Sequence, residues 1–120
     1  MTSKRILLIC RKAPYGNTLA REIAEMALAA GAFDQELAIA FIGDGVWQLL
    51  DQQDSVDIQQ KNHQKLLAAF ELYGISESYV DSEALAERHI DHSRLSLAAK
   101  PVTQQQLAEL FERADIVLTV

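Results

Sequence analysis

Residues 5–10 read Arg-Ile-Leu-Leu-Ile-Cys, a continuous apolar run that does not alternate with polar residues. A strand with this pattern is usually covered on both faces, as in a parallel sheet that lies between helices. Residues 36–42, Glu-Leu-Ala-Ile-Ala-Phe-Ile, have the same character, and residues 116–120, Ile-Val-Leu-Thr-Val, close the chain in the same way. The three segments predict three buried strands. Two shorter strands are predicted at residues 78–80 and at residues 94–98, and Pro101 breaks the second of these.

Between these strands the apolar residues recur at helical spacing. The first helix begins at Thr18, and Gly31 and Gly74 supply the C-terminal stops of the first two helices. Asp81 or Ser82 can N-cap the third helix. The apolar positions are Leu19, Ile23, Met26, Ala27 and Ala30 in the first helix, Leu66, Phe70 and Tyr73 in the second, and Leu85 in the third.

The C-terminal part of the chain holds the clearest helix start. Residues Thr103–Gln106 form a capping-box pattern, which predicts a last helix with an apolar face of Leu107, Leu110, Phe111 and Ala114. A short helical piece is expected at Val46–Leu50, and the polar stretch Asp51–Gln60 is expected to be irregular and exposed. Strands that alternate with helices predict one α/β domain over residues 1–120, a three-layer α/β/α sandwich with a five-stranded parallel sheet.

The composition narrows the functional class. Hydrophobic residues make up 49% of the 120 residues and charged residues 23%, as in soluble globular domains. No apolar run approaches the roughly 20 residues that span a bilayer, and residues 6–10 are too short for a signal-peptide core, so we expect a cytoplasmic protein without membrane contact. The net charge of −6 disfavours direct binding to nucleic acid. A single cysteine excludes an internal disulfide and a cysteine-based zinc site within the chain.

No motif predicts a catalytic, cofactor or metal site. Gly43-Asp44-Gly45 follows a strand, but Gln48 stands where a dinucleotide fingerprint needs its third glycine, so a tight turn into a helix is the favoured interpretation. Residues 11–16 follow the first strand and lack the glycines of a phosphate loop, which favours a conformational or subunit-contact role. His89 and His92 flank an aspartate, and this loose spacing favours a solvated turn over a metal pair.

Cys10 is the only residue that can act as a thiol nucleophile. It ends a predicted buried strand, and free cysteines are among the most buried residue types. Arg11 and Lys12 would lower the pKa of the thiol if it were exposed at the strand tip. Because burial usually decides whether a cysteine is reactive, we favour an inert core role for Cys10.

An apolar cluster follows the second strand. It contains Val46, Trp47, Leu49 and Leu50. Two interpretations stay open, since Trp47 can belong to the core or can be presented to a partner protein. The candidate interface residues are Tyr15, Val46, Trp47 and Leu50.

Four strings carry a family resemblance. They are Arg11–Gly16, Gly31–Gln35, Asp44–Leu49 and Tyr79–Asp81, and together they resemble the TusC/DsrF branch of the DsrE-like sulfur-relay family. The match runs in order from the first strand to about Ile90, about three quarters of the chain, and the chain length resembles TusC more than the longer DsrF proteins. The resemblance implies a five-stranded parallel sheet and no cofactor.

The resemblance also implies partners and a pathway. These are TusB-like and TusD-like subunits in a heterohexamer, with two copies of each subunit, and a downstream sulfur carrier that docks on the complex. Persulfide sulfur passes through such a complex toward 2-thiouridine at the tRNA wobble position.

In the catalytic TusD-like subunit the cysteine follows the third strand. Val80 or Asp81 occupies that place here, so the resemblance implies a non-catalytic subunit. Three alternatives stay open: a DsrF-like role in dissimilatory sulfur oxidation, an auxiliary persulfide carrier that uses Cys10, and a flavodoxin-like module that binds a small ligand.

Overall fold

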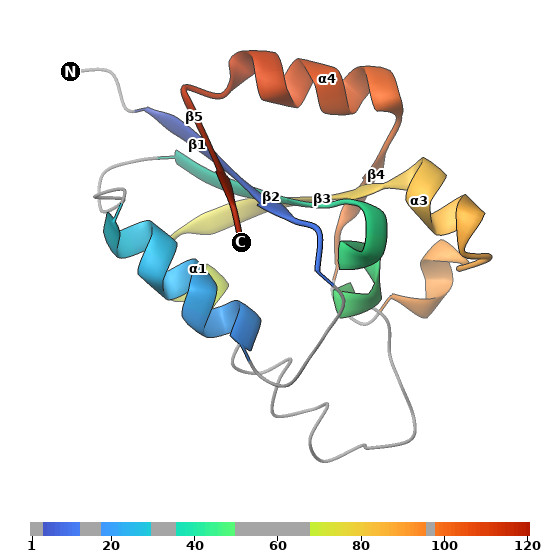
Figure 1. Cartoon of the computed structure of the whole chain (residues 1–120), viewed down its shortest axis with the longest axis horizontal. Coiled ribbons are helices and arrows are strands. Elements are labelled where there is room, and N and C mark those ends of the chain that lie inside the picture. The colour runs from blue at the N-terminus through green and yellow to red at the C-terminus, as the bar shows by residue number, and fades with distance from the viewer. Residues whose placement is uncertain (1–3, 13–17, 30–35, 50–67, 96–97) are drawn as a thin grey trace.

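The structure is a computed structural model that describes residues 4–12, 18–29, 36–49, 68–95 and 98–120. Its described strands form one five-stranded sheet in the order β4-β3-β2-β1-β5, and all neighbouring strands are parallel. Figure 1 shows this sheet between helices, which confirms the predicted α/β fold. The strands are β1 (Arg5–Cys10), β2 (Glu36–Phe41), β3 (Ile75–Asp81), β4 (Lys100–Val102) and β5 (Ile116–Thr119).

The strand order explains where the helices lie. From β1 to β4 the chain steps one strand at a time in one direction, and right-handed crossovers place all these connections on one side of the sheet. This side carries α1 (Thr18–Ala29), the 3-10 helix η2 (Gly43–Leu49) and α3 (Ser82–Glu87). The chain then returns from β4 to β5 across the full width of the sheet, and α4 (Gln104–Arg113) covers the opposite side (Figure 1).

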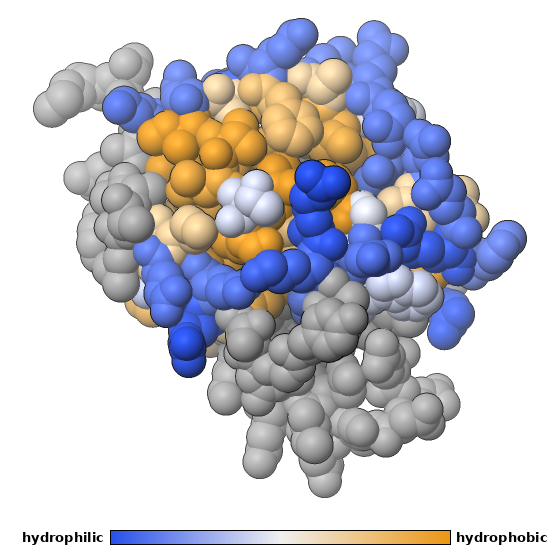
Figure 2. Space-filling view, in the orientation of Figure 1, coloured by the Kyte–Doolittle hydropathy of each residue, from blue (hydrophilic) through white to orange (hydrophobic). Residues whose placement is uncertain are grey.

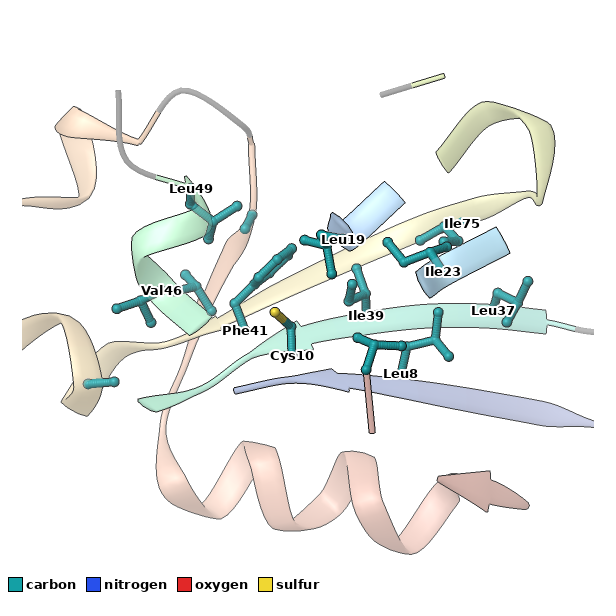
Figure 3. Close-up of a cluster of buried hydrophobic side chains, with 14 of the residues drawn as sticks. Leu8, Cys10, Leu19, Ile23, Leu37, Ile39, Phe41, Val46, Leu49 and Ile75 are labelled. Atoms are coloured by element: carbon teal, nitrogen blue, oxygen red, sulfur yellow. The ribbon is translucent and has the colours of Figure 1, made fainter. Parts of the chain in front are cut away.

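Two apolar clusters fill the space between these layers. On the α1 side, Leu8 and Ile39 come from adjacent central strands and pack with Ile23, and all three side chains are fully buried (Figure 3). On the α4 side, Leu7, Ile9 and Ala40 pack with Leu107 and Leu110. Both faces of the central strands are therefore buried, as the unbroken apolar run of β1 predicts.

Four of the five predicted strands are confirmed, with small shifts at their ends. β1 has its predicted bounds, β2 ends one residue earlier than predicted, at Phe41, and β3 begins earlier, at Ile75. β5 ends at Thr119.

The fourth strand was predicted at residues 94–98, of which 96–97 lie outside the described residues. At the described positions the prediction is wrong, because Arg94 belongs to a 3-10 helix and Leu95 forms only a single β-bridge. Residues 92–94 form the short 3-10 helix η4 (His92–Arg94), and β4 lies later and contains Pro101, which was expected to break it. β4 is an edge strand, so only one of its sides pairs with β3. The N–H that Pro101 lacks can be one that would have pointed away from β3, and then no ladder hydrogen bond is lost.

The predicted helix ends are largely confirmed. Thr103 Oγ1 accepts a hydrogen bond from the backbone N–H of Gln106 at 3.2 Å, and Gln106 Oε1 accepts one from the N–H of Thr103 at 2.9 Å. Asp81, rather than Ser82, caps α3. Residues 68–72 are helical, and Gly74 follows them with a φ of +69°.

Some predictions lie outside the described residues. These are Ala30, Gly31, Leu66 and the polar stretch 51–60. Among the described helices, none combines the length and the apolar character needed to cross a bilayer.

Candidate functional site at the carboxyl edge of the sheet

The thiol of Cys10 lies at the carboxyl end of β1, inside the core. Its exposed fraction is 0%, and Figure 3 shows its sulfur among apolar side chains that include Phe41. Burial raises the pKa of the thiol to about 11, an effect that a backbone hydrogen bond at Lys12 partly offsets. Sγ lies 3.9 Å from the Lys12 carbonyl oxygen. The predicted burial of Cys10 is confirmed.

The Lys12 ammonium group, two residues after Cys10, pairs with a carboxylate and not with the thiol. Lys12 Nζ lies 3.0 Å from Glu22 Oε1 in a largely exposed ion pair. The nearby Glu22 carboxylate raises the thiol pKa and Lys12 lowers it, and both effects are smaller than burial. The Lys12 carbonyl oxygen also accepts a hydrogen bond from Gln48 Nε2 at 3.2 Å, which ties the chain after β1 to η2.

The glycines after β2 allow a close approach of two backbones. Gly43 has a φ of +52°, and Gly45 donates from its N–H to the carbonyl oxygen of Ile42 at 2.8 Å. A Cβ atom at Gly45 would collide with the carbonyl oxygen of Cys10. This segment therefore packs on β1, and the interpretation as a tight turn into a helix is confirmed.

The candidate interface residues divide between core and surface. Val46 is completely buried, so its side chain packs in the core and is not available to a partner; this corrects its place among the candidate interface residues. Trp47 is half-buried and packs against the same core cluster, so one part of its side chain remains accessible. Tyr15 and Leu50 lie outside the described residues.

A capping network occupies the end of β3. Val80 is completely buried. Asp81 Oδ1 accepts hydrogen bonds from the N–H of Glu83 at 3.0 Å and from Gln104 Nε2 at 2.8 Å. Ser82 Oγ donates to the carbonyl oxygen of Val102 at 2.9 Å. These groups join α3, β4 and α4 and hold no thiol.

Arg88 is a structural residue that the sequence patterns did not indicate. Its Nη2 and Nε lie 2.9 and 3.3 Å from Asp44 Oδ1, and its Nη1 donates to the carbonyl oxygen of Ala84 at 3.1 Å. The ion pair fastens η2 to α3 across the carboxyl edge of the sheet. No local signal predicts it, because the partners are 44 residues apart in sequence.

The two histidines near α3 have separate structural surroundings. His89 adopts a φ of +54° just after the helix, and His92 Nε2 lies 3.2 Å from the carbonyl oxygen of Ala99. The described residues contain no cluster of three or more histidine, cysteine, aspartate or glutamate side chains that could hold a metal ion.

The fold and this edge define a small α/β domain whose one cysteine is buried, and comparison with known proteins places it in a family. Residues 4–120 match the DsrE/DsrF-like family, so the chain belongs to it. It is 37% identical to a "Protein TusC homolog" of Pseudomonas aeruginosa, over 98% of this chain and 99% of the relative. A "Protein TusC homolog" of Vibrio parahaemolyticus is 34% identical over 96% of this chain and 98% of its own.

Two further proteins are similar to this chain. The "Intracellular sulfur oxidation protein DsrF" of Allochromatium vinosum is 35% identical over 89% of this chain and 70% of its own length. The crystal structure of the ychN protein from E. coli superimposes with a TM-score of 0.69 at 23% identity, covering 98% of this chain and 99% of that one. The ychN likeness supports the fold alone.

Proposed function

We propose that this chain is a non-catalytic structural subunit of a sulfur-relay heterohexamer that passes persulfide sulfur toward 2-thiouridine at the tRNA wobble position. The near full-length similarity to TusC homologues supports this assignment. In this proposal the chain is a single cytoplasmic domain over residues 1–120. It assembles with TusB-like and TusD-like subunits and does not contact nucleic acid directly, which agrees with its net charge of −6.

The surroundings of Cys10 carry the non-catalytic part of the proposal. A persulfide forms on a thiolate, and a thiol with a pKa of about 11 is ionised in about one molecule in ten thousand at pH 7. The sulfur is also fully buried, so a donor persulfide cannot reach it without opening the core. At the end of β3, Asp81 supplies a helix cap where catalysis would need a thiol. The catalytic cysteine is therefore assigned to the TusD-like subunit.

A second candidate is a DsrF-like subunit in sulfur oxidation. The 35% identity to the DsrF protein favours it, although this chain covers only 70% of that relative's length. The near complete coverage of the TusC homologues makes tRNA thiolation the first choice. An auxiliary carrier role for Cys10 is disfavoured by its burial.

The test combines assembly with a product measurement in cells. The tagged chain is co-expressed with the TusB-like and TusD-like proteins of the same genome, and we expect the three to purify in equal amounts. Deletion of this chain should remove 2-thiouridine from tRNA, and Cys10→Ser should restore it to near the wild-type level. If deletion leaves 2-thiouridine unchanged and slows sulfur oxidation, the DsrF-like role replaces the proposal. Loss of 2-thiouridine in Cys10→Ser cells whose complex is intact would overturn the non-catalytic assignment.

A further inference from the structure

The 3-10 helix η2 lies against the chain at the end of β1. A Cβ atom at Gly45 would collide with the carbonyl oxygen of Cys10, so the two backbones are in close contact. Gln48 Nε2 lies 3.2 Å from the carbonyl oxygen of Lys12, and Cys10 Sγ lies 3.9 Å from the same oxygen. η2 therefore contacts the segment that holds the Cys10 thiol at two of its carbonyl groups.

The apolar side chains of η2 help to bury this thiol. Val46 and Leu49 belong to the same core cluster as Cys10 and Phe41, and each of the four is at most 1% exposed. Figure 3 shows these side chains together at the carboxyl ends of the strands. Figure 2 shows hydrophilic residues in front of the place where Figure 1 draws the end of β1 and η2. The thiol is therefore closed off from solvent, and η2 forms part of its enclosure.

One ion pair connects η2 to the helix that follows β3. Asp44 is the only charged residue of η2, and its Oδ1 lies 2.9 Å from Arg88 Nη2. The Asp44 side chain is 62% exposed and that of Arg88 is 21% exposed. Arg88 is itself fixed to α3, because its Nη1 donates to the carbonyl oxygen of Ala84 at 3.1 Å and lies 3.6 Å from Glu87 Oε2. The pair thus anchors a short helix to a residue that is already held in place.

The backbone of η2 is suited to local movement. A 3-10 helix has poorer hydrogen-bond geometry than an α-helix, so its own backbone bonds stabilise it less. η2 begins at Gly43, which has a φ of +52°, a conformation that glycine adopts without steric cost. Residues at the ends of elements that tolerate such angles often serve as hinges. The segment therefore has a possible pivot at its first residue and an ion pair at its second.

We propose that η2 is a hinged cover over the Cys10 thiol and that the Asp44–Arg88 ion pair holds this cover closed. When the pair breaks, η2 moves about Gly43, and Val46 and Leu49 withdraw from the thiol. Sγ then becomes accessible to solvent while the strands remain paired, which makes this a local opening and not global unfolding. In the closed state the thiol does not react. This inference goes beyond the proposed function and does not depend on it.

The rate of thiol labelling measures this opening. The purified full-length chain is treated with 5,5′-dithiobis(2-nitrobenzoic acid) at pH 8, and because Cys10 is the only cysteine the rate reports on this position alone. Asp44→Ala should speed labelling about fivefold, the effect expected of a partly exposed ion pair. Asp44→Ala should have no further effect in the Arg88→Ala background, since the same interaction is already lost. Added salt should speed labelling of the wild type and not of Asp44→Ala.

Two control variants separate local opening from global unfolding. Leu110→Ala removes core packing on the α4 side of the sheet, away from η2, and should lower the free energy of unfolding while labelling stays at the wild-type rate. Glu36→Ala breaks the exposed ion pair with Arg5 at the opposite ends of the strands and should leave labelling unchanged.

Three results would overturn the inference. The first is labelling of Asp44→Ala at the wild-type rate, and the second is an equal effect of salt on Asp44→Ala and the wild type. The third is a set of labelling rates that follows the free energies of unfolding of all variants, because the thiol would then be reached only by global unfolding. None of these results concerns assembly with related subunits, so the proposed function would stand.

Discussion

A desolvated thiol is a weak acid and a poor nucleophile, and Cys10 is such a thiol. Its sulfur lies among apolar side chains, and burial raises its pKa from 9.0 to about 11. The adjacent cation does not reverse this, since Lys12 pairs with Glu22. At the residue scale the surroundings of Cys10 therefore favour a packed, protonated thiol.

The first prediction concerns pH. The unfolded chain releases the Cys10 proton near pH 9, but the folded chain holds it until about pH 11. This contribution to stability is present below pH 9 and is lost as the pH rises from 9 to 11, by up to about 2 to 3 kcal/mol. Urea unfolding of the wild type and of Cys10→Ser at pH 8 and pH 10.5 measures it. The stability difference between the two proteins should shrink at the higher pH, and a constant difference would contradict the predicted burial effect.

The second prediction concerns His89. This residue has a φ of +54° and ends α3, where the N–H of Ile90 donates to the carbonyl oxygen of Leu85 and the N–H of His89 donates to that of Ala86. Glycine adopts this left-handed conformation at no steric cost. We expect His89→Gly to raise the free energy of unfolding by about 1 kcal/mol, as measured by urea denaturation. His89→Ala is the control and should give no gain; equal gains would mean that the imidazole itself is unfavourable.

At the scale of elements, the carboxyl edge is held by contacts between segments that are distant in sequence. η2 packs its backbone on the end of β1 and reaches α3 through the pair of Asp44 and Arg88. α3 in turn is capped by Asp81, whose carboxylate also accepts a hydrogen bond from the side chain of Gln104 in α4. These contacts link η2, α3 and α4 at the carboxyl edge. A substitution at Gly45 should therefore also disturb the elements that contact η2.

Gly45→Ala tests this arrangement. A Cβ atom at this position would collide with the carbonyl oxygen of Cys10, and backbone cannot move aside as a flexible side chain can. We expect a loss of about 3 kcal/mol in the free energy of unfolding, measured by thermal or urea denaturation. Gly74→Ala is the matched control, because a Cβ atom there meets no atom within 4 Å and only the positive φ opposes it. A smaller loss for Gly45→Ala than for Gly74→Ala would contradict the close approach.

Some of these elements could be predicted from the sequence, and others could not. β1 and the capping box at Thr103 were predictable because their signals are local: an unbroken apolar run, and two side chains three residues apart. β4 was misplaced because Pro101 disfavours a strand locally, and only its position at the edge of the sheet makes it acceptable. The two interpretations of Trp47 stayed open for a similar reason. The exposure of its side chain depends on which elements pack around η2, and the local sequence does not show this. The ion pair of Arg88 links distant segments and left no local signal.

At the scale of the whole molecule, function depends on which surfaces remain after the core is formed. Neighbouring residues of η2 differ in this respect, because Val46 is completely buried and Trp47 is half-buried. The Val46 side chain faces the core alone, whereas part of the Trp47 side chain remains accessible.

Trp47 and Val46 make a matched pair for the assembly prediction. Trp47→Ala should weaken assembly with the TusB-like and TusD-like subunits by about 2 kcal/mol, and its stability loss should stay below the roughly 3–5 kcal/mol of a fully buried tryptophan. Val46→Ala should lower the melting temperature and leave assembly unchanged once folded. Thermal melts paired with co-purification measure both effects. Unchanged assembly of Trp47→Ala with a large melting loss would assign Trp47 to the core.

The return of the chain from β4 to β5 also shapes how the protein can be made. Strands β1 to β4 each join the sheet beside the strand synthesised just before, so this part can assemble in order as the chain leaves the ribosome. β5 instead inserts beside β1, the first strand made, and brings α4 over the sheet as it does so. Until residues 116–119 emerge, the outer side of β1 has no neighbour among the described strands, so no described strand pairs with the N–H and C=O groups on that side. A nascent chain that stalls before residue 116 is therefore prone to aggregate, although four of its five strands have already been synthesised.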